Sequence, residues 1–222
     1  MNMNLFLAIS LSLTAGCTKS IDNSSDTGSD GTIACEDSVN GVTRTLIDST
    51  SEEEWVYLDF ERCEVVEVAE PESSATWDVG FRRFNPKING GVSGAGEMEV
   101  AILDGANFDE VSSAPADGYV TDTADDDDDG VPEYAMEGWY IYHMEDHTLS
   151  PADLVYVIKT VEGGYVKLRF EDYYDDAGTS GYLQFSWAFI DEPGAGGSEG
   201  GGEAEGGEAE GGEAEGGEAE GG

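Results

Sequence analysis

The spacing of apolar residues between residues 35 and 191 constrains the fold more than any other feature. Valine, isoleucine and aromatic residues alternate there with polar ones over short segments, which is the period of β-strands. Eight segments are expected to form strands: EWVYLDF (54–60), CEVVEV (63–68), TWDVGFRRF (76–84), GEMEVAIL (96–103), GWYIYH (138–143), DLVYVIKT (153–160), GYVKLRFEDYY (164–174) and GYLQFSWAFI (181–190). Turn-forming residues separate them, and Glu162-Gly163-Gly164 is expected to close a hairpin. Since no longer window combines helical periodicity with caps, we predict one all-β domain over residues 35–191.

The N-terminal residues have the pattern of an export signal. Residues 1–17 contain an apolar stretch, Leu5 to Leu13, that is too short to span a bilayer in the mature protein. The sequence LTAGC resembles the bacterial lipobox, in which the cysteine, here Cys17, is acylated and becomes the first residue. No Lys or Arg precedes the apolar stretch, which departs from that pattern, and an ordinary buried N-terminal helix is the alternative. Residues 18–34 are polar and are interpreted as a tether.

The remaining cysteines agree with export. Cys35 and Cys63 are an even pair once Cys17 is set aside, and we expect a disulfide between them, with two buried free thiols as the alternative.

Residues 192–222 include four copies of GGEAE, a repeat that cannot bury apolar surface. We interpret this segment as a disordered tail, and a spacer, a solubilising segment or no specific role fits its composition.

The charge of the chain excludes several partners. Asp and Glu number 49 against 9 Lys and Arg, so the electrostatic field repels phosphate and a nucleic-acid partner is not expected. An acidic membrane surface is disfavoured for the same reason, so that any membrane association would depend on the lipid anchor. Cationic partners, divalent metals or simple solvation remain as explanations for the acidity.

Residues 76–96 carry motifs that resemble a known family. Trp77-Asp78, Phe81-Arg82-Arg83, Asn89-Gly90-Gly91 and Ser93-Gly94 resemble the HmuY-type haemophore lipoproteins. The resemblance continues through GWYIYHMEDHTLSP, VYVIKTVEGGYVKLRFEDYY and SGYLQFSWAFI, and so covers about residues 76–190. It implies an all-β fold with loops projecting at one end, and capture of haem at a bacterial outer surface for delivery to an outer-membrane receptor. It also implies that two side chains, histidines or methionines, hold the haem iron axially.

His143 and His147, the two histidines of the chain, are the first candidates for iron ligands. A zinc-protease motif needs Glu directly after the first histidine on a helix, whereas the order here is H-M-E-D-H in a segment without helical character. In an extended segment, at about 3.3 Å per residue, the two histidines would lie about 13 Å apart, too far for one iron. Both can therefore bind one haem only if the connecting loop folds back. We expect His147 as one ligand and Met136, Met144 or His143 as the other, with two exposed, ligand-free histidines as the alternative.

Arg82 and Arg83 are the candidates for contacts with the haem propionates. Together with Lys87 they form the cationic cluster of an otherwise acidic domain, and guanidinium groups pair well with carboxylates. Strand alternation directs Arg82 and Arg83 to opposite faces, so we expect at most one of them to serve directly. Solvation or pairing with neighbouring acids is the alternative for both.

The acidic stretch at residues 122–133 is a candidate calcium site. Asp125, Asp127 and Asp129, followed by a glycine, match the first half of an EF-hand loop, in which alternate carboxylates face one cation. The second half departs from that pattern, because position twelve is Met136 and Glu133 is the nearest preceding acid. Calcium would relieve the repulsion between such closely spaced carboxylates, and a solvated acidic loop is the alternative.

Two classes of function follow from these observations. The first is a haem-binding lipoprotein at the outer membrane or cell surface, and the second is a structural or adhesive β-domain, with or without calcium, that binds no haem. An enzyme is not expected, because neither histidine has an evident serine or cysteine partner and no nucleophile or phosphate-binding motif is present.

Substitution of Cys17 tests the anchor. Cys17→Ala should release the protein from membranes or stall its processing, because the acylated residue would be lost. Thr18, rather than Asp, follows this cysteine, which under the usual bacterial sorting rule implies passage to the outer membrane. Membrane fractionation of the parent and the variant measures the effect, and an unchanged membrane fraction would contradict the assignment.

Overall fold

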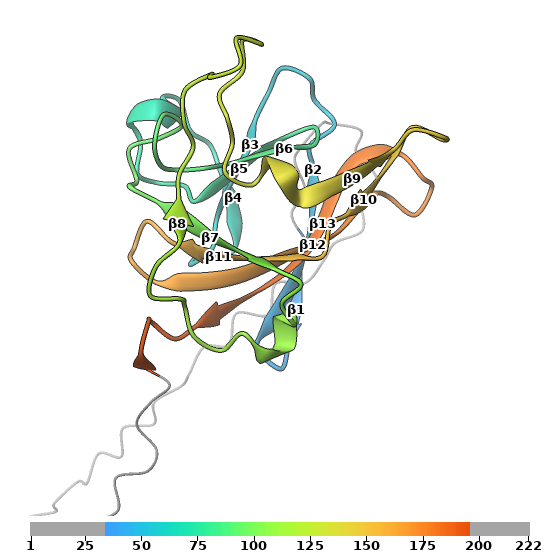
Figure 1. Cartoon of the computed structure of the whole chain (residues 1–222). Coiled ribbons are helices and arrows are strands. Elements are labelled where there is room, and N and C mark those ends of the chain that lie inside the picture. Colours follow the sequence, from blue (N-terminus) through green and yellow to red (C-terminus); the bar gives the residue numbers. More distant parts are fainter. Residues whose placement is uncertain (1–33, 196–222) are drawn as a thin grey trace, which may run out of the picture. The chain divides into compact units, whose positions relative to one another are not determined.

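The computed structural model describes residues 34–195, with side chains from residue 40 onward (Figure 1). Cys17, the predicted signal segment and most of the predicted tether and tail lie outside the described residues. Within the described part, no helix has both the length and the apolar character needed to cross a membrane.

The described chain folds into antiparallel sheets joined by loops and three short 3₁₀ turns, η1 (Pro71–Ser73), η2 (Phe108–Glu110) and η3 (Glu137–Trp139). The seven-stranded sheet has the order β1 (Ala34–Val39), β2 (Val42–Asp48), β13 (Ser180–Ile190), β12 (Tyr165–Tyr174), β11 (Leu154–Lys159), β7 (Glu99–Asp104) and β8 (Tyr119–Val120). The four-stranded sheet has the order β4 (Glu64–Val66), β3 (Val56–Asp59), β5 (Val79–Arg82) and β6 (Asn85–Ile88). A separate hairpin consists of β9 (Tyr140–His143) and β10 (Thr148–Pro151).

The all-β prediction is confirmed, and each of the eight predicted segments contains a strand. Glu162-Gly163-Gly164 closes the β11–β12 hairpin as expected, with the Gly163 amide donating to the Thr160 carbonyl over 2.9 Å. Strands β1, β2, β6, β8 and β10 were not predicted. Strand β6 includes Pro86, a residue that is typical of turns and so argues against a strand in the sequence. The proline is tolerated because β6 lies at the edge of its sheet.

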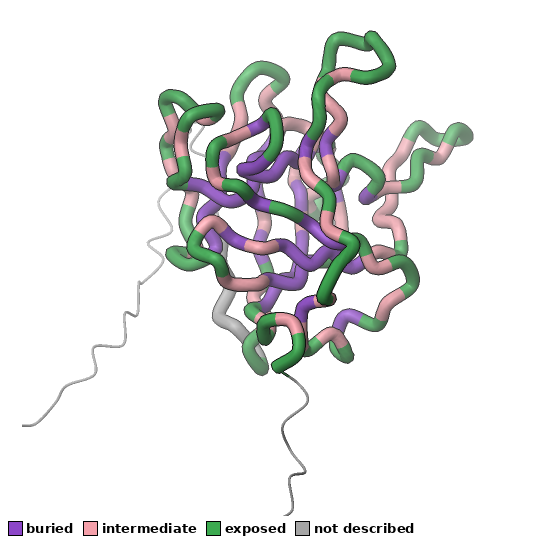
Figure 2. Tube along the Cα trace, turned by 60° about the vertical axis from the view of Figure 1, so that its left-hand side comes forward, coloured by how far each residue is buried: buried purple, intermediate pink, exposed green. Residues whose placement is uncertain are grey.

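The core lies between the two larger sheets. Val79 and Phe81 alternate with outward residues on β5, and their side chains are fully buried against the seven-stranded sheet. The Phe81 ring stacks on Phe185 of β13 with centroids 5.4 Å apart, and meets Phe170 of β12 edge-on at 6.4 Å. Figure 2 shows this buried interior beneath exposed loops. Removing one of these rings would cost about 3–5 kcal/mol, which is the usual loss for a buried phenylalanine.

A buried carboxylate connects the two sheets. Asp78 precedes β5, is 1% exposed, and accepts the Phe60 amide at 2.8 Å and the Val161 amide at 3.0 Å. Phe60 follows β3 in the four-stranded sheet, whereas Val161 begins the β11–β12 turn in the seven-stranded sheet. Burial raises the pKa of Asp78 to about 7, although both amide donors oppose the shift.

A second buried polar side chain supports the same region. Asn89 is 0% exposed; its amide donates to the Trp77 carbonyl at 2.6 Å and the Ser74 carbonyl at 3.0 Å, and its oxygen accepts the Gly96 amide at 2.9 Å. A Cβ atom at Gly94 would lie 1.9 Å from the Asn89 oxygen, so only glycine fits there. The Trp77-Asp78 and Asn89-Gly90-Gly91 motifs are thus parts of one buried hydrogen-bond network.

The pH dependence of stability tests the role of Asp78. Between about pH 4 and 7 the folded state keeps a proton on Asp78 that the unfolded state has released, so its contribution to the free energy of unfolding falls as pH rises. Asp78→Asn cannot titrate and leaves one backbone amide without an acceptor, which costs about 1–3 kcal/mol. The parent should therefore have a larger free energy of unfolding than the variant at pH 4.5, and this difference should become smaller at pH 7. Urea denaturation of both proteins at the two pH values measures it.

The exposed Asp153→Asn variant serves as the control, since its side chain makes none of these contacts. A difference between parent and Asp78→Asn that stays constant across this pH range would contradict the assigned titration.

Candidate functional site

The two histidines lie at opposite ends of one turn in the β9–β10 hairpin. His143 ends β9 and pairs with Thr148 of β10, and the amide of His147 donates to the carbonyl of His143 over 2.9 Å. The connection between them therefore folds back, as binding of one haem by both would require. In Figure 1 this hairpin projects beside the end of the β12–β13 hairpin.

His147 occupies an unusual backbone conformation with a specific side-chain contact. Its φ is +59°, in the left-handed region that a non-glycine residue adopts at an energetic cost. Its exposed ring forms a hydrogen bond through Nδ1 with the hydroxyl of Tyr142. Because this bond engages Nδ1, the other ring nitrogen, Nε2, is the candidate donor to iron.

His143 is held differently and on the other face of the hairpin. Its Nε2 lies 2.8 Å from the hydroxyl of Ser150, and the side chain is half-buried. Tyr142 and His143 are adjacent in one strand and so point to opposite faces. Since His147 contacts Tyr142 while His143 contacts Ser150, the two rings lie on opposite faces of the hairpin and do not converge on one point.

The methionines separate into one exposed and two buried side chains among the described residues. Met144, in the turn of the hairpin, is 73% exposed, and its thioether is accessible. Met136 is 0% exposed and packs in the core with Trp139, and Met98 is 1% exposed. The expectation that Met136 serves as an iron ligand does not agree with this structure, because its sulfur is enclosed by the core.

Aromatic side chains fix the base of the hairpin. The indole Nε1 of Trp139 donates to the carbonyl of Phe84 over 2.8 Å, and the Phe84 ring contacts Tyr140 and Tyr173 at centroid distances of 5.7 and 6.4 Å. The Leu149 amide of β10 donates to the hydroxyl of a β12 tyrosine over 2.9 Å. The hairpin therefore has an anchored base and an exposed tip.

The two arginines point to different regions. Arg83 donates to the Thr50 carbonyl at 3.0 Å and the Ser180 hydroxyl at 3.2 Å, near the end of the β12–β13 hairpin. Burial raises the pKa of Tyr173, a residue at the hairpin base, and the positive charge of Arg83 opposes this shift. Arg82 instead lies over the ring of Trp55, with its guanidinium carbon 4.7 Å from the ring centroid. Of the two arginines, Arg83 is thus the one whose charge acts on a residue at the hairpin base.

The acidic loop brings together three of the four predicted calcium ligands. Carboxylate oxygens of Asp125, Asp127 and Glu133 lie within 4.8 Å of one another, whereas Asp129 accepts the Val131 amide at 2.8 Å and is not part of this group. One oxygen of Asp125, Oδ1, is buried and has no hydrogen-bond partner. Two backbone hydrogen bonds between residues 123 and 133, of 3.0 and 3.1 Å, close the base of the loop.

The electrostatics of this loop reflect crowding of like charges. An amide donor at Asp126 lowers the pKa of Glu133, but desolvation and the carboxyl groups of Asp126 and Asp127 raise it, and the net pKa lies above the usual range. A divalent cation would relieve such repulsion, and water would complete its coordination, because calcium takes about six to eight oxygen ligands.

The predicted cysteine pair is partly described. Cys63 is disulfide-bonded. The backbone of Cys35 lies in β1, opposite Thr45 of β2, but the side chains of β1 lie outside the described part. A disulfide between Cys35 and Cys63 stays a prediction.

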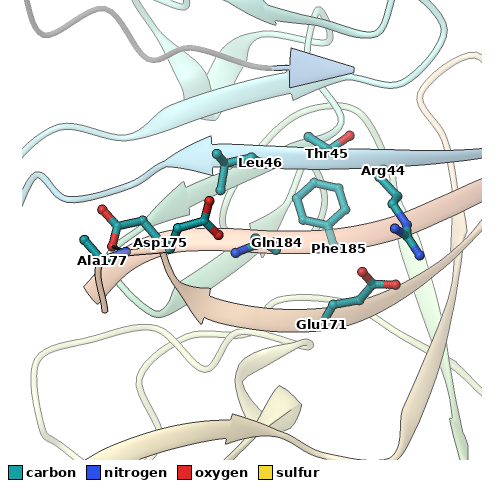
Figure 3. A pocket seen from close by; sticks show the side chains of 9 residues that line it. Arg44, Thr45, Leu46, Glu171, Asp175, Ala177, Gln184 and Phe185 are labelled. Carbon is teal, nitrogen blue, oxygen red and sulfur yellow. Dashed lines mark hydrogen bonds between the residues drawn. The ribbon is translucent and has the colours of Figure 1, made fainter. Parts of the chain in front are cut away.

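A pocket of about 550 Å³ opens on the outer face of β2, β12 and β13 (Figure 3). It is lined by Arg44, Thr45, Leu46, Glu171, Asp175, Asp176, Ala177, Gln184 and Phe185. None of these residues is a histidine or methionine, and the Asp175 carboxylate already accepts the Ala177 and Thr179 amides. With three carboxylates and one arginine, the pocket would repel the propionates of haem, and it is not the candidate site.

Two contributors to the hairpin site were missed in the sequence. Tyr142 was counted only as a strand residue, although a tyrosine next to His143 in an alternating strand must face the opposite side from that histidine. Phe84 was assigned to a strand, but it lies after β5, where its ring and carbonyl contact the hairpin base. No periodicity marks either role, because both depend on contacts between segments distant in sequence.

Comparisons with known proteins agree with this architecture. The family model described as HmuY protein matches residues 51–152 and 129–187. A Bacteroides fragilis protein described as a lipoprotein is 21% identical and has a TM-score of 0.53, with coverage of 72% of this chain and 96% of its own. An apo HmuY analog from Tannerella forsythia is 17% identical, with a TM-score of 0.54 and coverage of 74% and 99%.

A further solved structure, from Bacteroides vulgatus and described as HmuY-like and haem-binding, is 21% identical, with a TM-score of 0.52 and coverage of 71% and 96%. At such identities the structural likeness shows the fold alone. A search of curated proteins gives no match. The match to the family model extends over more than half of the chain, and this protein belongs to the HmuY family.

Proposed function

We propose that this protein is a haem-binding surface lipoprotein that captures haem and passes it to an outer-membrane receptor. Membership of the HmuY family supports the haem ligand, and the Bacteroides vulgatus structure with the same fold is described as haem-binding. Anchoring through Cys17 and transfer to a receptor depend on the lipobox resemblance and on the family resemblance, and they concern residues or partners outside the described structure.

The contact between Tyr142 and His147 carries the proposal. An imidazole that binds iron through Nε2 must hold its proton on Nδ1, and a hydrogen-bond acceptor at Nδ1 both selects that tautomer and orients the ring. The Tyr142 hydroxyl lies at Nδ1 of His147 and can act as that acceptor. His147 is also exposed at a hairpin tip, where a large planar ligand has access.

The second ligand would come from Met144 or from outside this hairpin. His143 is a poor partner for His147 in this conformation, because its ring lies on the other hairpin face and its Nε2 is engaged by Ser150. Met144 is adjacent in the turn and highly exposed, and a His/Met pair is chemically ordinary for haem iron. Arg83 lies near the hairpin base and is the arginine that we assign to a propionate.

Haem titration of the purified protein, followed in the Soret and Q bands, tests the site. His147→Ala should change the spin state of the haem iron and raise the dissociation constant for haem by more than about tenfold. Loss of a residue that only hydrogen-bonds to a metal ligand already lowers metal affinity by about 10–100-fold. Tyr142→Phe removes the acceptor while keeping the ring, and should weaken binding by about tenfold with His147 still ligated.

His143→Ala is the matched control, and should change the spectrum less because it lies on the other face. If His143→Ala, His147→Ala and the double variant all retain the parent's spectrum and affinity, the histidines do not ligate haem. If the parent protein binds no haem, the haem-binding function is excluded and the second candidate function remains.

That second candidate is a structural or adhesive β-domain stabilised by calcium. The unpartnered Oδ1 of Asp125, within the group formed with Asp127 and Glu133, favours it. A cation there would give the buried oxygen a partner, and calcium binding by itself is compatible with haem binding because the loop and the hairpin are separate segments.

Thermal unfolding with added calcium tests this site. An ion that binds the folded state alone stabilises it by an amount that grows with the logarithm of ligand excess, so millimolar calcium should raise the melting temperature and chelator should lower it. Asp125→Asn should abolish the response, whereas the exposed Asp117→Asn should keep it. Magnesium at matched ionic strength controls for screening, and a melting curve unmoved by calcium and chelator would make the loop a solvated acidic segment.

A further inference from the structure

The outer face of the four-stranded sheet holds two cations among aromatic rings. Tyr57 of β3, Gly80 of β5 and Lys87 of β6 are paired across the three strands and so lie in one row. Arg82 lies two residues after Gly80 and shares its face, because side chains on a strand alternate. This face is opposite to the one on which Phe81 packs in the core.

Lys87 is enclosed by three aromatic rings. Its Nζ lies 4.2 Å from the ring centroid of Trp55, 5.1 Å from that of Tyr57 and 5.3 Å from that of Trp77. The side chain is 7% exposed. Ring faces attract the ammonium group electrostatically but supply no hydrogen-bond acceptor of the strength of an oxygen.

Arg82 lies over the same ring of Trp55, at 4.7 Å from guanidinium carbon to centroid. The Trp55 ring also meets Tyr134 edge-on, with centroids 5.6 Å apart. Both Trp55 and Arg82 are half-buried, so this edge of the cluster reaches the surface. We call Trp55, Arg82, Lys87 and Tyr134 the cationic–aromatic face.

Neither cation forms an ion pair with a carboxylate of the described residues, in spite of the acidity of the chain. Among the described residues, Arg62 and Arg169 form ion pairs with carboxylates, whereas no carboxylate lies within 4.0 Å of the Arg82 guanidinium or the Lys87 ammonium. The charge of Asp122 acts on Lys87, but both oxygens of that carboxylate already accept backbone amides, from Ile88 at 3.1 Å and Ala135 at 2.8 Å.

The backbone is adapted to this arrangement. A Cβ atom at Gly80 would lie 3.1 Å from Cε of Lys87 and from two ring carbons of Tyr57, so that glycine leaves the lysine side chain room to cross the strand. Burial lowers the pKa of Lys87 to about 8; the charges of Asp122 and Glu72 oppose this shift, and that of Arg82 adds to it. The ammonium group is therefore incompletely compensated within the protein, and an anion would compensate it.

We propose that the cationic–aromatic face is a binding site for the carboxylate or phosphate group of a small ligand, held between Arg82 and Lys87 beside the ring of Trp55. The guanidinium of Arg82 offers donors in a planar fork that matches both anions, and the Trp55 ring offers a surface for an apolar part of the ligand. This site is distinct from the β9–β10 hairpin and does not depend on haem binding.

Titration with inorganic phosphate and with succinate, at ionic strength held constant with sodium chloride, tests the proposal on the intact chain. The probe is the indole N–H signal of Trp55 in a ¹H–¹⁵N spectrum, assigned by Trp55→Phe among the four tryptophans of the chain. One or both anions should shift this signal saturably. Arg82→Gln and Lys87→Met should each weaken the binding by at least about tenfold, the usual value of a hydrogen bond to a charged group.

Arg44→Gln is the matched control, since this exposed arginine of β2 belongs to the other sheet and should leave the titration unchanged. Arg82→Gln replaces a half-buried side chain, so it tests the site even if Lys87→Met fails to fold. A Trp55 signal that moves no more with phosphate or succinate than with chloride overturns the proposal, as does binding that survives both substitutions.

Haem titrations of Arg82→Gln and Arg83→Gln separate this site from the proposed function. We expect Arg83→Gln to weaken haem binding and to leave anion binding intact, and Arg82→Gln to do the reverse. If Arg82→Gln abolishes haem binding, the cationic–aromatic face binds a haem propionate, and the proposal of a separate anion site is overturned. Failure of haem to bind at all would contradict the proposed function without affecting the anion titration.

Discussion

The Asp78 carboxylate accepts backbone amides from both larger sheets, and the relative position of those sheets depends on it. Phe60 and Val161, its two donors, belong to connections that are about one hundred residues apart in the chain. Burying a carboxyl group is costly unless its oxygens are hydrogen-bonded, and here both are. The same pairing fixes the start of β5, and with it the direction in which Phe81 enters the core and Arg82 leaves it.

The segment that follows β5 supports the base of the hairpin proposed to bind haem. The chain after β5 places the Phe84 carbonyl against the indole of Trp139 and the Phe84 ring against Tyr140. The base of the β9–β10 hairpin is thereby held to the body of the domain, while its tip, with Met144 and His147, lies beyond these contacts and is exposed. A rigid base with an accessible tip is a suitable arrangement for a binding site, because the protein spends little entropy in positioning it.

The sequence predicted those parts of the fold that alternation of apolar residues encodes, and it failed where polar residues form strands. Strand β10, TLSP, and strand β6, NPKI, have prolines and polar residues and become strands through pairing with a neighbour. Within the site, the folding back of residues 143–147 was recognised as a requirement, but the contact of His147 with Tyr142 depends on one left-handed residue that no pattern indicates. Met136 is a candidate ligand from the sequence because its thioether can bind haem iron, yet tertiary packing encloses its side chain in the core.

The left-handed backbone at His147 has a consequence for how this hairpin can change. A histidine in that conformation costs about 1–3 kcal/mol relative to a relaxed residue, whereas glycine adopts it freely and asparagine more easily than most residues. Selection for thermal stability alone would therefore favour glycine or asparagine at position 147 and remove the imidazole. Laboratory evolution of this domain for thermal stability would therefore have to hold position 147 fixed if the haem site proposed for His147 is to be preserved.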